Sequence, residues 1–161
     1  MNMEGIIYLT LDQAIVIHKK TIQYSGGGTY EHFDLGRLES VLQNIQNDDY
    51  YPTFEEKLTH LFYCTCEFHC FADGNKRLAI TLCAQFLLFN GYMAAAKSFF
   101  TEMENISYYV AAGKIGKELL LRIMIAILDG TYDRDEELKL AILHAIESVS
   151  YTHLRAHETR G

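Results

Sequence analysis

The sequence has little proline, little cysteine and a deficit of positive charge. One proline and eleven glycines among 161 residues exclude collagen-like and proline-rich disordered chains. Four cysteines are too few for a disulfide scaffold in a chain of this length, so we interpret them as reduced thiols. The length, with a hydrophobic share of 49%, predicts one compact globular domain.

Basic residues number 14 against 21 acidic ones, and the formal net charge is -7. We therefore expect no basic surface that holds nucleic acid, and any anion must bind at one local site. The longest apolar run, over residues 78–89, is shorter than the roughly 20 residues that span a bilayer. The N-terminal segment lacks the features of a secretory signal. We expect a cytoplasmic protein without a nucleic-acid or membrane partner.

Apolar residues recur at helical spacing along most of the chain and predict an all-α fold. Thr10 with Gln13 forms a capping box that starts one helix, which the triple glycine at residues 26–28 must end. Thr53 with Glu56 forms a second capping box. Further helices are predicted over residues 34–47, 53–69, 75–89, 104–112, 114–128 and 133–146.

Two regions stand out from this general pattern. The helix predicted over residues 75–89 is apolar on nearly every side, which is typical of a central helix in a bundle. Residues 149–161 lack apolar periodicity, and their sequence is similar to a translated sequencing-library adapter. We therefore interpret residues 1–148 as the domain and residues 149–161 as a non-native tail. We assign no role to the histidines and arginines of this tail, His153, Arg155, His157 and Arg160.

The segment over residues 68–77, which reads FHCFADGNKR, carries the candidate chemistry. A turn containing Gly74 and Asn75 directly before a buried helix directs free backbone N–H groups and the positive end of the helix dipole at one point. Such a point favours an anion such as phosphate. Lys76 and Arg77 are unfavourably placed for that dipole, and a bound polyphosphate would explain their presence.

Two other side chains of this segment suit phosphate transfer. Asp73 beside a bound phosphate could hold Mg²⁺ together with phosphate oxygens. His69 titrates near neutrality and is the natural general base. The plain alternatives are a hydrogen-bonded core role for His69 and an ordinary turn at Asp73. Lys76 and Arg77 could likewise be the solvated start of a helix.

The segment resembles the active-site motif of the Fic/Doc (fido) family, His-x-Phe-x-[Asp/Glu]-x-Asn-x-Arg. Five fixed residues rarely coincide by chance, and all five positions are filled, by His69, Phe71, Asp73, Asn75 and Arg77. Further stretches, at residues 8–12, 26–28, 38–40 and 86–92, look like the death-on-curing (Doc-like) branch of the family. The resemblance covers roughly residues 6–95 and implies a fido-type helical bundle.

The resemblance also implies an activity, which is transfer of part of a nucleoside triphosphate such as ATP, with Mg²⁺, to a protein. The acceptor would be a Ser, Thr or Tyr hydroxyl of a target protein, for example a translation factor. Carried over by position, His69 is the base, Asp73 the Mg²⁺ ligand and Phe71 the apolar anchor of the loop. The nucleotide-binding positions are Gly74, Asn75, Lys76 and Arg77.

Three positions depart from the pattern of relatives that transfer AMP, His-Pro-Phe-x-x-Gly-Asn-Gly-Arg-x-x-Arg. Cys70 replaces the proline, Lys76 replaces the second glycine, and Ile80 replaces the second arginine. That arginine positions the terminal phosphate for AMP transfer in the family, so its loss favours phosphoryl transfer. AMP transfer and an inactive nucleotide-binding or interaction module remain alternatives. The family's self-inhibitory pattern is absent from the sequence, which suggests a separate antitoxin as the inhibitor.

Three other features of the sequence have a plain structural or docking interpretation. Thiols and imidazoles suggest a zinc site, at His60, Cys64, Cys66, His69 and Cys70. Cys64 and Cys66 face different sides of a helix, so we favour buried thiols that pack as small apolar groups. Residues 25–33 resemble the region of the fold near which target segments dock. The Tyr108–Tyr109 pair and residues 119–128 are interpreted as core or interface.

Overall fold

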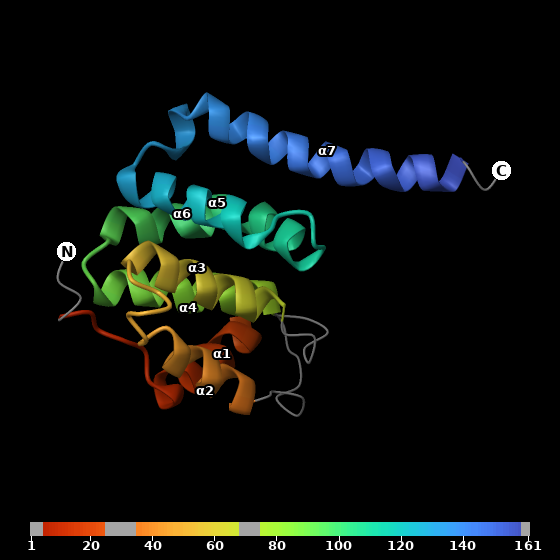
Figure 1. Ribbon diagram of the computed structural model, residues 1–161. Helices are drawn as coiled ribbons and strands as arrows, with labels where there is room; N and C mark the ends of the chain where they lie inside the picture. The colour runs from red at the N-terminus through yellow and green to blue at the C-terminus, as the bar shows by residue number, and fades with distance from the viewer. Residues whose placement is uncertain (1–4, 25–34, 68–74, 159–161) are drawn as a thin grey trace.

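The computed structural model describes residues 5–24, 35–67 and 75–158. Within these ranges the chain forms α-helices, one short 3-10 helix and no strand, which confirms the all-α prediction. The helices are α1 (Leu11–Tyr24), α2 (Leu35–Asn44), α3 (Phe54–Cys66), α4 (Asn75–Phe89), α5 (Met93–Ala111), α6 (Lys117–Asp129), η1 (Tyr132–Arg134) and α7 (Glu136–Glu158). In Figure 1, α1 and α2 lie on one side, α3 and α4 in the middle, and α7 on the opposite side beyond α5 and α6.

Helix α4 is the central element of the bundle. It packs against α1, α3 and α5. Leu78, Leu82 and Phe86 are fully buried, and so are Ala79 and Cys83 on other sides of the helix. Burial on nearly every side confirms the prediction of a central helix, and it fixes the position of the first turn of α4, where the candidate motif ends.

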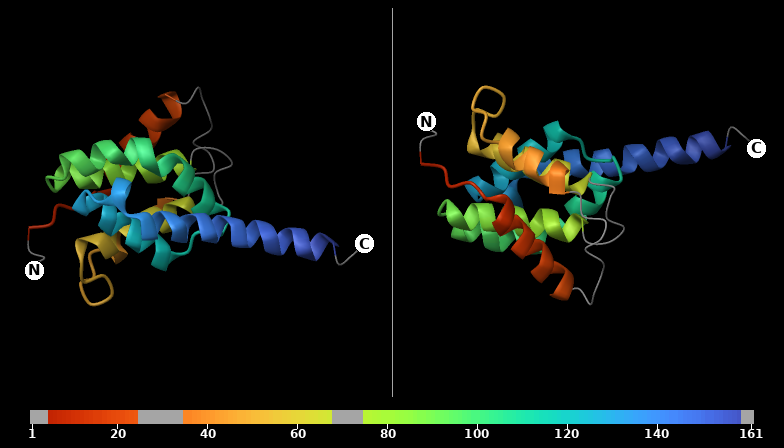
Figure 2. Two further views of the ribbon diagram at one scale, coloured as in Figure 1. Left: turned by 90° about the horizontal axis from the view of Figure 1, so that it is seen from above. Right: turned by 90° about the horizontal axis from the view of Figure 1, so that it is seen from below.

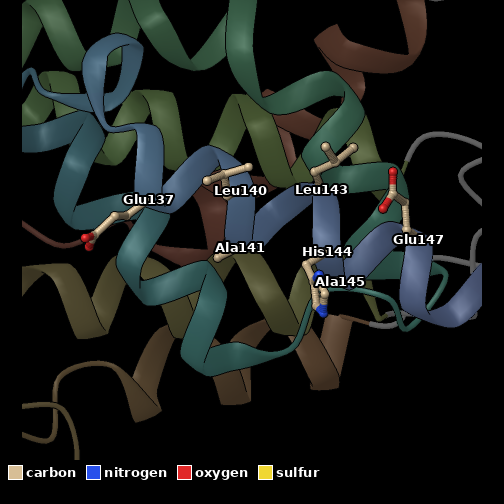
Figure 3. A pocket seen from close by; sticks show the side chains of 7 residues that line it. All are labelled: Glu137, Leu140, Ala141, Leu143, His144, Ala145 and Glu147. Atoms are coloured by element: carbon tan, nitrogen blue, oxygen red, sulfur yellow. The ribbon is translucent and has the colours of Figure 1, made fainter.

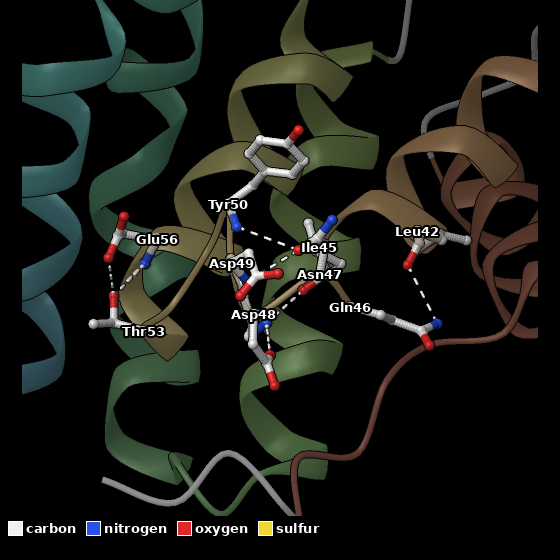
Figure 4. A network of polar contacts seen from close by, with 10 residues as sticks. Leu42, Ile45, Gln46, Asn47, Asp48, Asp49, Tyr50, Thr53 and Glu56 are labelled. Carbon is white, nitrogen blue, oxygen red and sulfur yellow. Dashed lines mark hydrogen bonds and ion pairs between the residues drawn. The ribbon is translucent and has the colours of Figure 1, made fainter.

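The predicted capping box at Thr10 is complete, and at Thr53 the N-cap bond is present while the Glu56 carboxylate bonds the Thr53 hydroxyl. At the start of α1 the Gln13 N–H donates to Thr10 Oγ1 at 3.1 Å, and the Thr10 N–H donates to Gln13 Oε1 at 2.9 Å. At the start of α3 the Glu56 N–H donates to Thr53 Oγ1 at 3.1 Å, and the Thr53 hydroxyl donates to the Glu56 carboxylate at 2.9 Å (Figure 4). Three of these four bonds satisfy backbone N–H groups that have no partner inside the helix. The bonds at Thr10 and Thr53 mark the starts of α1 and α3, the two helices that pack against α4 from earlier in the chain.

A buried lysine holds the connection between α2 and α3. Lys57 Nζ, whose side chain is fully buried, donates to the Ile45 carbonyl oxygen and to Asp48 Oδ1, both at 2.7 Å. The Tyr8 ring centroid lies 5.6 Å from the same nitrogen. Because a buried ammonium group is costly unless it is paired and hydrogen-bonded, we interpret Lys57 as a structural residue.

Several predicted helix ends were wrong. α2 ends at Asn44 rather than residue 47, and α3 ends at Cys66 with Glu67 as its C-cap, rather than at residue 69. α5 begins at Met93, well before residue 104, directly after a turn in which Gly91 has a φ of 86°. No capping residue marks this start, and Tyr92 at the N-cap position makes no side-chain capping bond.

The two C-terminal helices also differ from the prediction. α6 begins at Lys117 rather than residue 114, because Gly116 before it is extended, with a ψ of 179°. α7 begins at Glu136, where the Leu138 N–H donates to Asp135 Oδ1 at 3.0 Å. It continues past residue 146 to Glu158, and its C-terminal part extends beyond the rest of the bundle (Figure 2). The interpretation of residues 149–161 as non-native stays a prediction.

The predicted core segment in the C-terminal half is confirmed in large part. Over residues 119–128, Leu120, Ile123, Met124, Ala126 and Ile127 are buried. Tyr109 packs against the core, whereas Tyr108 is 57% exposed. No helix in the described ranges combines the length and the apolar character needed to cross a membrane.

Candidate functional site

The candidate motif connects the end of α3 to the start of α4. His69, Phe71, Asp73 and Gly74 lie outside the described residues, as do Cys70 and the region of residues 25–33. The roles predicted for them stay predictions. The other three nucleotide-binding candidates, Asn75, Lys76 and Arg77, form the first turn of α4.

The first turn of α4 has two cations and no acidic residue. A helix N-terminus already carries partial positive charge from its free N–H groups, so Lys76 and Arg77 add like charge there. Neither side chain forms an ion pair with a residue that the structure describes. Lys76 acts electrostatically on Cys66, where burial raises the pKa of the thiol and the lysine partly opposes that rise. This turn is therefore an electropositive point in an acidic protein.

A cavity of about 850 Å³ opens beside this turn, between α1, α4 and α5. Its volume lies in the range of small-molecule sites. The charged residues that line it are Lys20 from α1, Lys76 and Arg77 from α4, and Glu104 from α5. The large apolar side chains on its wall are Ile17, Ile80, Leu88 and Phe100. The cavity thus combines three cations with an apolar wall.

Two features of this cavity bear on the sequence predictions. Ile80, which stands where AMP-transferring relatives have an arginine, lies on the wall and is 7% exposed. The wall is therefore apolar at that position. Lys20 and Glu104 were missed by the sequence analysis, because they lie on α1 and α5, far along the chain from the motif, and belong to no recognisable pattern.

The thiols and imidazoles of α3 make other contacts. Among the described residues, no three His, Cys, Asp or Glu side chains gather as a metal site would require. The His60 ring accepts a hydrogen bond at Nδ1 from Lys117 Nζ at 2.7 Å, and its Nε2 lies 3.2 Å from the Tyr51 hydroxyl. Cys64 Sγ lies 3.6 Å from the same ring. Burial, and then the Lys117 charge, lower the pKa of His60 to about 4.

A second hollow follows one face of α7 (Figure 3). All of its lining residues come from that helix, and they are Glu137, Leu140, Ala141, Leu143, His144, Ala145 and Glu147. Leu140 is 64% exposed and Leu143 is 50% exposed. A hollow formed by a single helix has no opposing wall to orient a small molecule, so we assign no chemistry to it.

Comparison with known proteins finds a family similarity over part of the chain. Residues 8–87 match the model of the Fic/DOC family. The match begins before α1, includes the whole motif and ends within α4, and it covers just under half of the chain. It supports the resemblance at the level of the family over these residues and does not distinguish the Doc-like branch. No curated protein and no solved structure matches the chain.

The family match bears on the reaction that the motif could catalyse. Fic/DOC proteins are typically transferases that use a nucleoside triphosphate and a divalent metal to modify other proteins, although some are inactive. The match therefore supports nucleotide-dependent transfer onto a protein partner. The cavity beside Lys76 and Arg77 is consistent with a site for the nucleotide.

Proposed function

We propose that this protein is a Doc-like transferase that uses Mg²⁺ and a nucleoside triphosphate to phosphorylate a hydroxyl side chain of a target protein. The observation that carries the proposal is that the motif ends in the first turn of the central helix, beside a cavity with three cations. A separate antitoxin would inhibit such an enzyme. A translation factor is one candidate target.

The described residues fit a nucleoside triphosphate. A phosphate chain is bound best where free backbone N–H groups, a helix dipole and cationic side chains meet. The first turn of α4 has all three, with Lys76 and Arg77 as the cations. Asp73 lies two residues before this helix in the sequence and would hold Mg²⁺. When bound, the metal neutralises charge on the phosphate oxygens.

The residues of the motif have complementary roles in this reaction. His69 accepts the proton of the target hydroxyl as its oxygen forms a bond to the γ-phosphorus. The bond from the γ-phosphorus to the bridging oxygen breaks, and the nucleoside diphosphate leaves. Lys76 and Arg77 stabilise the negative charge that develops on the phosphate oxygens. Gly74 and Asn75 contribute the backbone of the anion site.

The side chain at position 80 favours phosphoryl transfer over AMP transfer. Ile80 contributes an apolar, nearly buried group to the cavity wall, where an AMP-transferring relative has a guanidinium for the terminal phosphate. Lys76 in place of glycine adds a cation next to Arg77. AMP transfer is the second candidate, because the five fixed positions of the motif are shared by both activities. An inactive binding module is the third.

ATP labelled at either the α or the γ phosphate distinguishes these three candidate functions. The protein is incubated with Mg²⁺, each labelled ATP and a mixture of purified translation factors. We expect γ label on a protein hydroxyl and no α label. Label from the α position would instead establish AMP transfer, and binding of ATP without either label would establish an inactive module.

His69→Ala tests the role of the base. We expect loss of at least about 100-fold in labelling rate, since general-base catalysis typically contributes that much. His144→Ala, which removes an exposed histidine on α7, is the matched control and should leave the rate unchanged. Undiminished labelling by His69→Ala would contradict the mechanism.

A further inference from the structure

Lys20 brings a third cation to the cavity from outside the motif. It lies on α1, whereas Lys76 and Arg77 lie on α4, and all three line the same space. Glu104 is the one carboxylate among the described lining residues. Lys20, like the other two, forms no ion pair with any residue in the described ranges. An excess of positive charge in one cavity is notable in a chain whose net charge is -7.

A contact between α1 and α4 holds these cations on one cavity. The hydroxyls of Thr21 and Thr81 lie 3.1 Å apart, so one can donate to the other. Thr81 Oγ1 also lies 3.0 Å from the Arg77 carbonyl oxygen, one turn earlier on α4. Thr21 directly follows Lys20 and is only 8% exposed. The threonine pair is therefore a contact between α1 and α4. It lies next to Lys20 on α1 and one turn from Arg77 on α4.

We propose that Lys20 binds the phosphate chain of the nucleotide from α1, together with the cations of α4. This inference rests on the proposed function, because it takes the ligand to be a nucleoside triphosphate. A triphosphate carries several negative charges, and a lysine can neutralise one of them as a point charge. Three cations around one space repel each other until an anion enters it. A bound triphosphate removes that repulsion.

Calorimetric titration of the full chain with ATP tests the role of Lys20. We expect Lys20→Met to weaken ATP binding by about tenfold, the effect typical of losing one charge-assisted contact. Lys20→Arg should restore most of the affinity, because it keeps the charge. Lys19→Met is the matched control, since Lys19 is an exposed neighbour on the same helix that does not line the cavity. It should change the affinity by less than about twofold.

Two simpler probes assign the effect to the phosphates. Lys20→Met should bind inorganic tripolyphosphate more weakly than the wild type does, by the same factor as for ATP. The affinity for adenosine, which has no phosphate, should be the same in the variant and the wild type. Equal ATP affinities of Lys20→Met and Lys19→Met would overturn the role of Lys20 and leave the proposed function standing. Failure of the folded wild-type chain to bind ATP would overturn both.

Discussion

At the scale of single residues, the chain keeps several titratable groups neutral by burying them. His60 is 9% exposed, and it can accept a hydrogen bond from Lys117 only while its ring is uncharged. The rings of Tyr51 and Tyr63 each lie 5.7 Å from Lys117 Nζ and provide a favourable site for its charge. Protonation of His60 would place a second positive charge within hydrogen-bonding distance of this ammonium group.

This arrangement predicts a dependence of stability on pH. The pKa of His60 is lowered to about 4 in the folded chain, against an unfolded value of about 6.5. As pH falls through 6.5 the unfolded chain takes up a proton that the folded chain does not, so the free energy of unfolding decreases until about pH 4. We expect a loss on the order of 3 kcal/mol from this group between pH 7 and pH 4. Urea denaturation at intervals between pH 7 and pH 4 measures it.

The variant His60→Gln tests whether this residue causes the pH dependence of stability. His60→Gln keeps an oxygen that can accept from Lys117 and cannot titrate in this range. Its stability should fall less steeply than that of the wild type between pH 6.5 and pH 4. His144→Gln, on the exposed side of α7, serves as the control and should follow the wild-type curve. Identical slopes for His60→Gln and the wild type would contradict the prediction.

At the scale of elements, the connection of α2 to α3 depends on the buried Lys57. Asp48→Ala would leave the fully buried ammonium without its counter-ion. Because the Asp48 side chain is 56% exposed, water can replace part of this interaction, and we expect a cost at the lower end of the range for broken buried pairs, about 3 kcal/mol. Lys57→Met removes the charge itself and leaves the Ile45 carbonyl oxygen without its donor, which costs about 1–3 kcal/mol. We therefore expect Asp48→Ala to be the more destabilising of the two. Urea denaturation of both variants measures the difference.

The neighbouring Asp49 supplies the control for this comparison. Its side chain is exposed. Its backbone N–H donates to Asn47 Oδ1 at 2.9 Å, a bond that does not involve the carboxylate (Figure 4). Asp49→Ala should leave the free energy of unfolding nearly unchanged. If Asp48→Ala were as mild as Asp49→Ala, the lysine would be held by the Ile45 carbonyl alone.

The helices could be predicted from the sequence where local signals exist. The pairs Thr10 with Gln13 and Thr53 with Glu56 act within one turn, so their side chains alone mark the starts of α1 and α3. The start of α5 could not be found in this way, because Tyr92 provides no cap. Its position depends on packing against α4, a contact that no short stretch of sequence describes.

The same reasoning explains what was found of the candidate site. Asn75, Lys76 and Arg77 were predicted because the motif is contiguous, and the structure confirms that they begin a buried helix. Lys20 and Glu104 reach the cavity only through the packing of α1 and α5 onto α4. Such residues carry no sequence signal, because the distance along the chain between them is unrelated to their distance in space.

At the scale of the whole molecule, the charges are distributed unevenly. The chain is acidic overall, so its field repels a free nucleotide at long range, and screening by salt limits that repulsion to about 8–10 Å. Three cations nevertheless line one cavity, with a single carboxylate among the described lining residues. Among the described residues, positive charge is thus concentrated beside the start of α4, where the proposed nucleotide would bind.

The bundle itself should not need the last residues of the chain. Deletion of residues 149–161 should leave both the free energy of unfolding and the γ-phosphate labelling unchanged, as expected of a non-native tail. Deletion of residues 136–161 also removes Leu138, which is 1% exposed, and Ile142, which packs against the core. That larger deletion should cost at least about 2–3 kcal/mol, because it exposes the face of α6 that they cover. Urea denaturation of both truncated chains measures the contrast, and a shorter deletion as damaging as the longer one would show that the tail belongs to the fold.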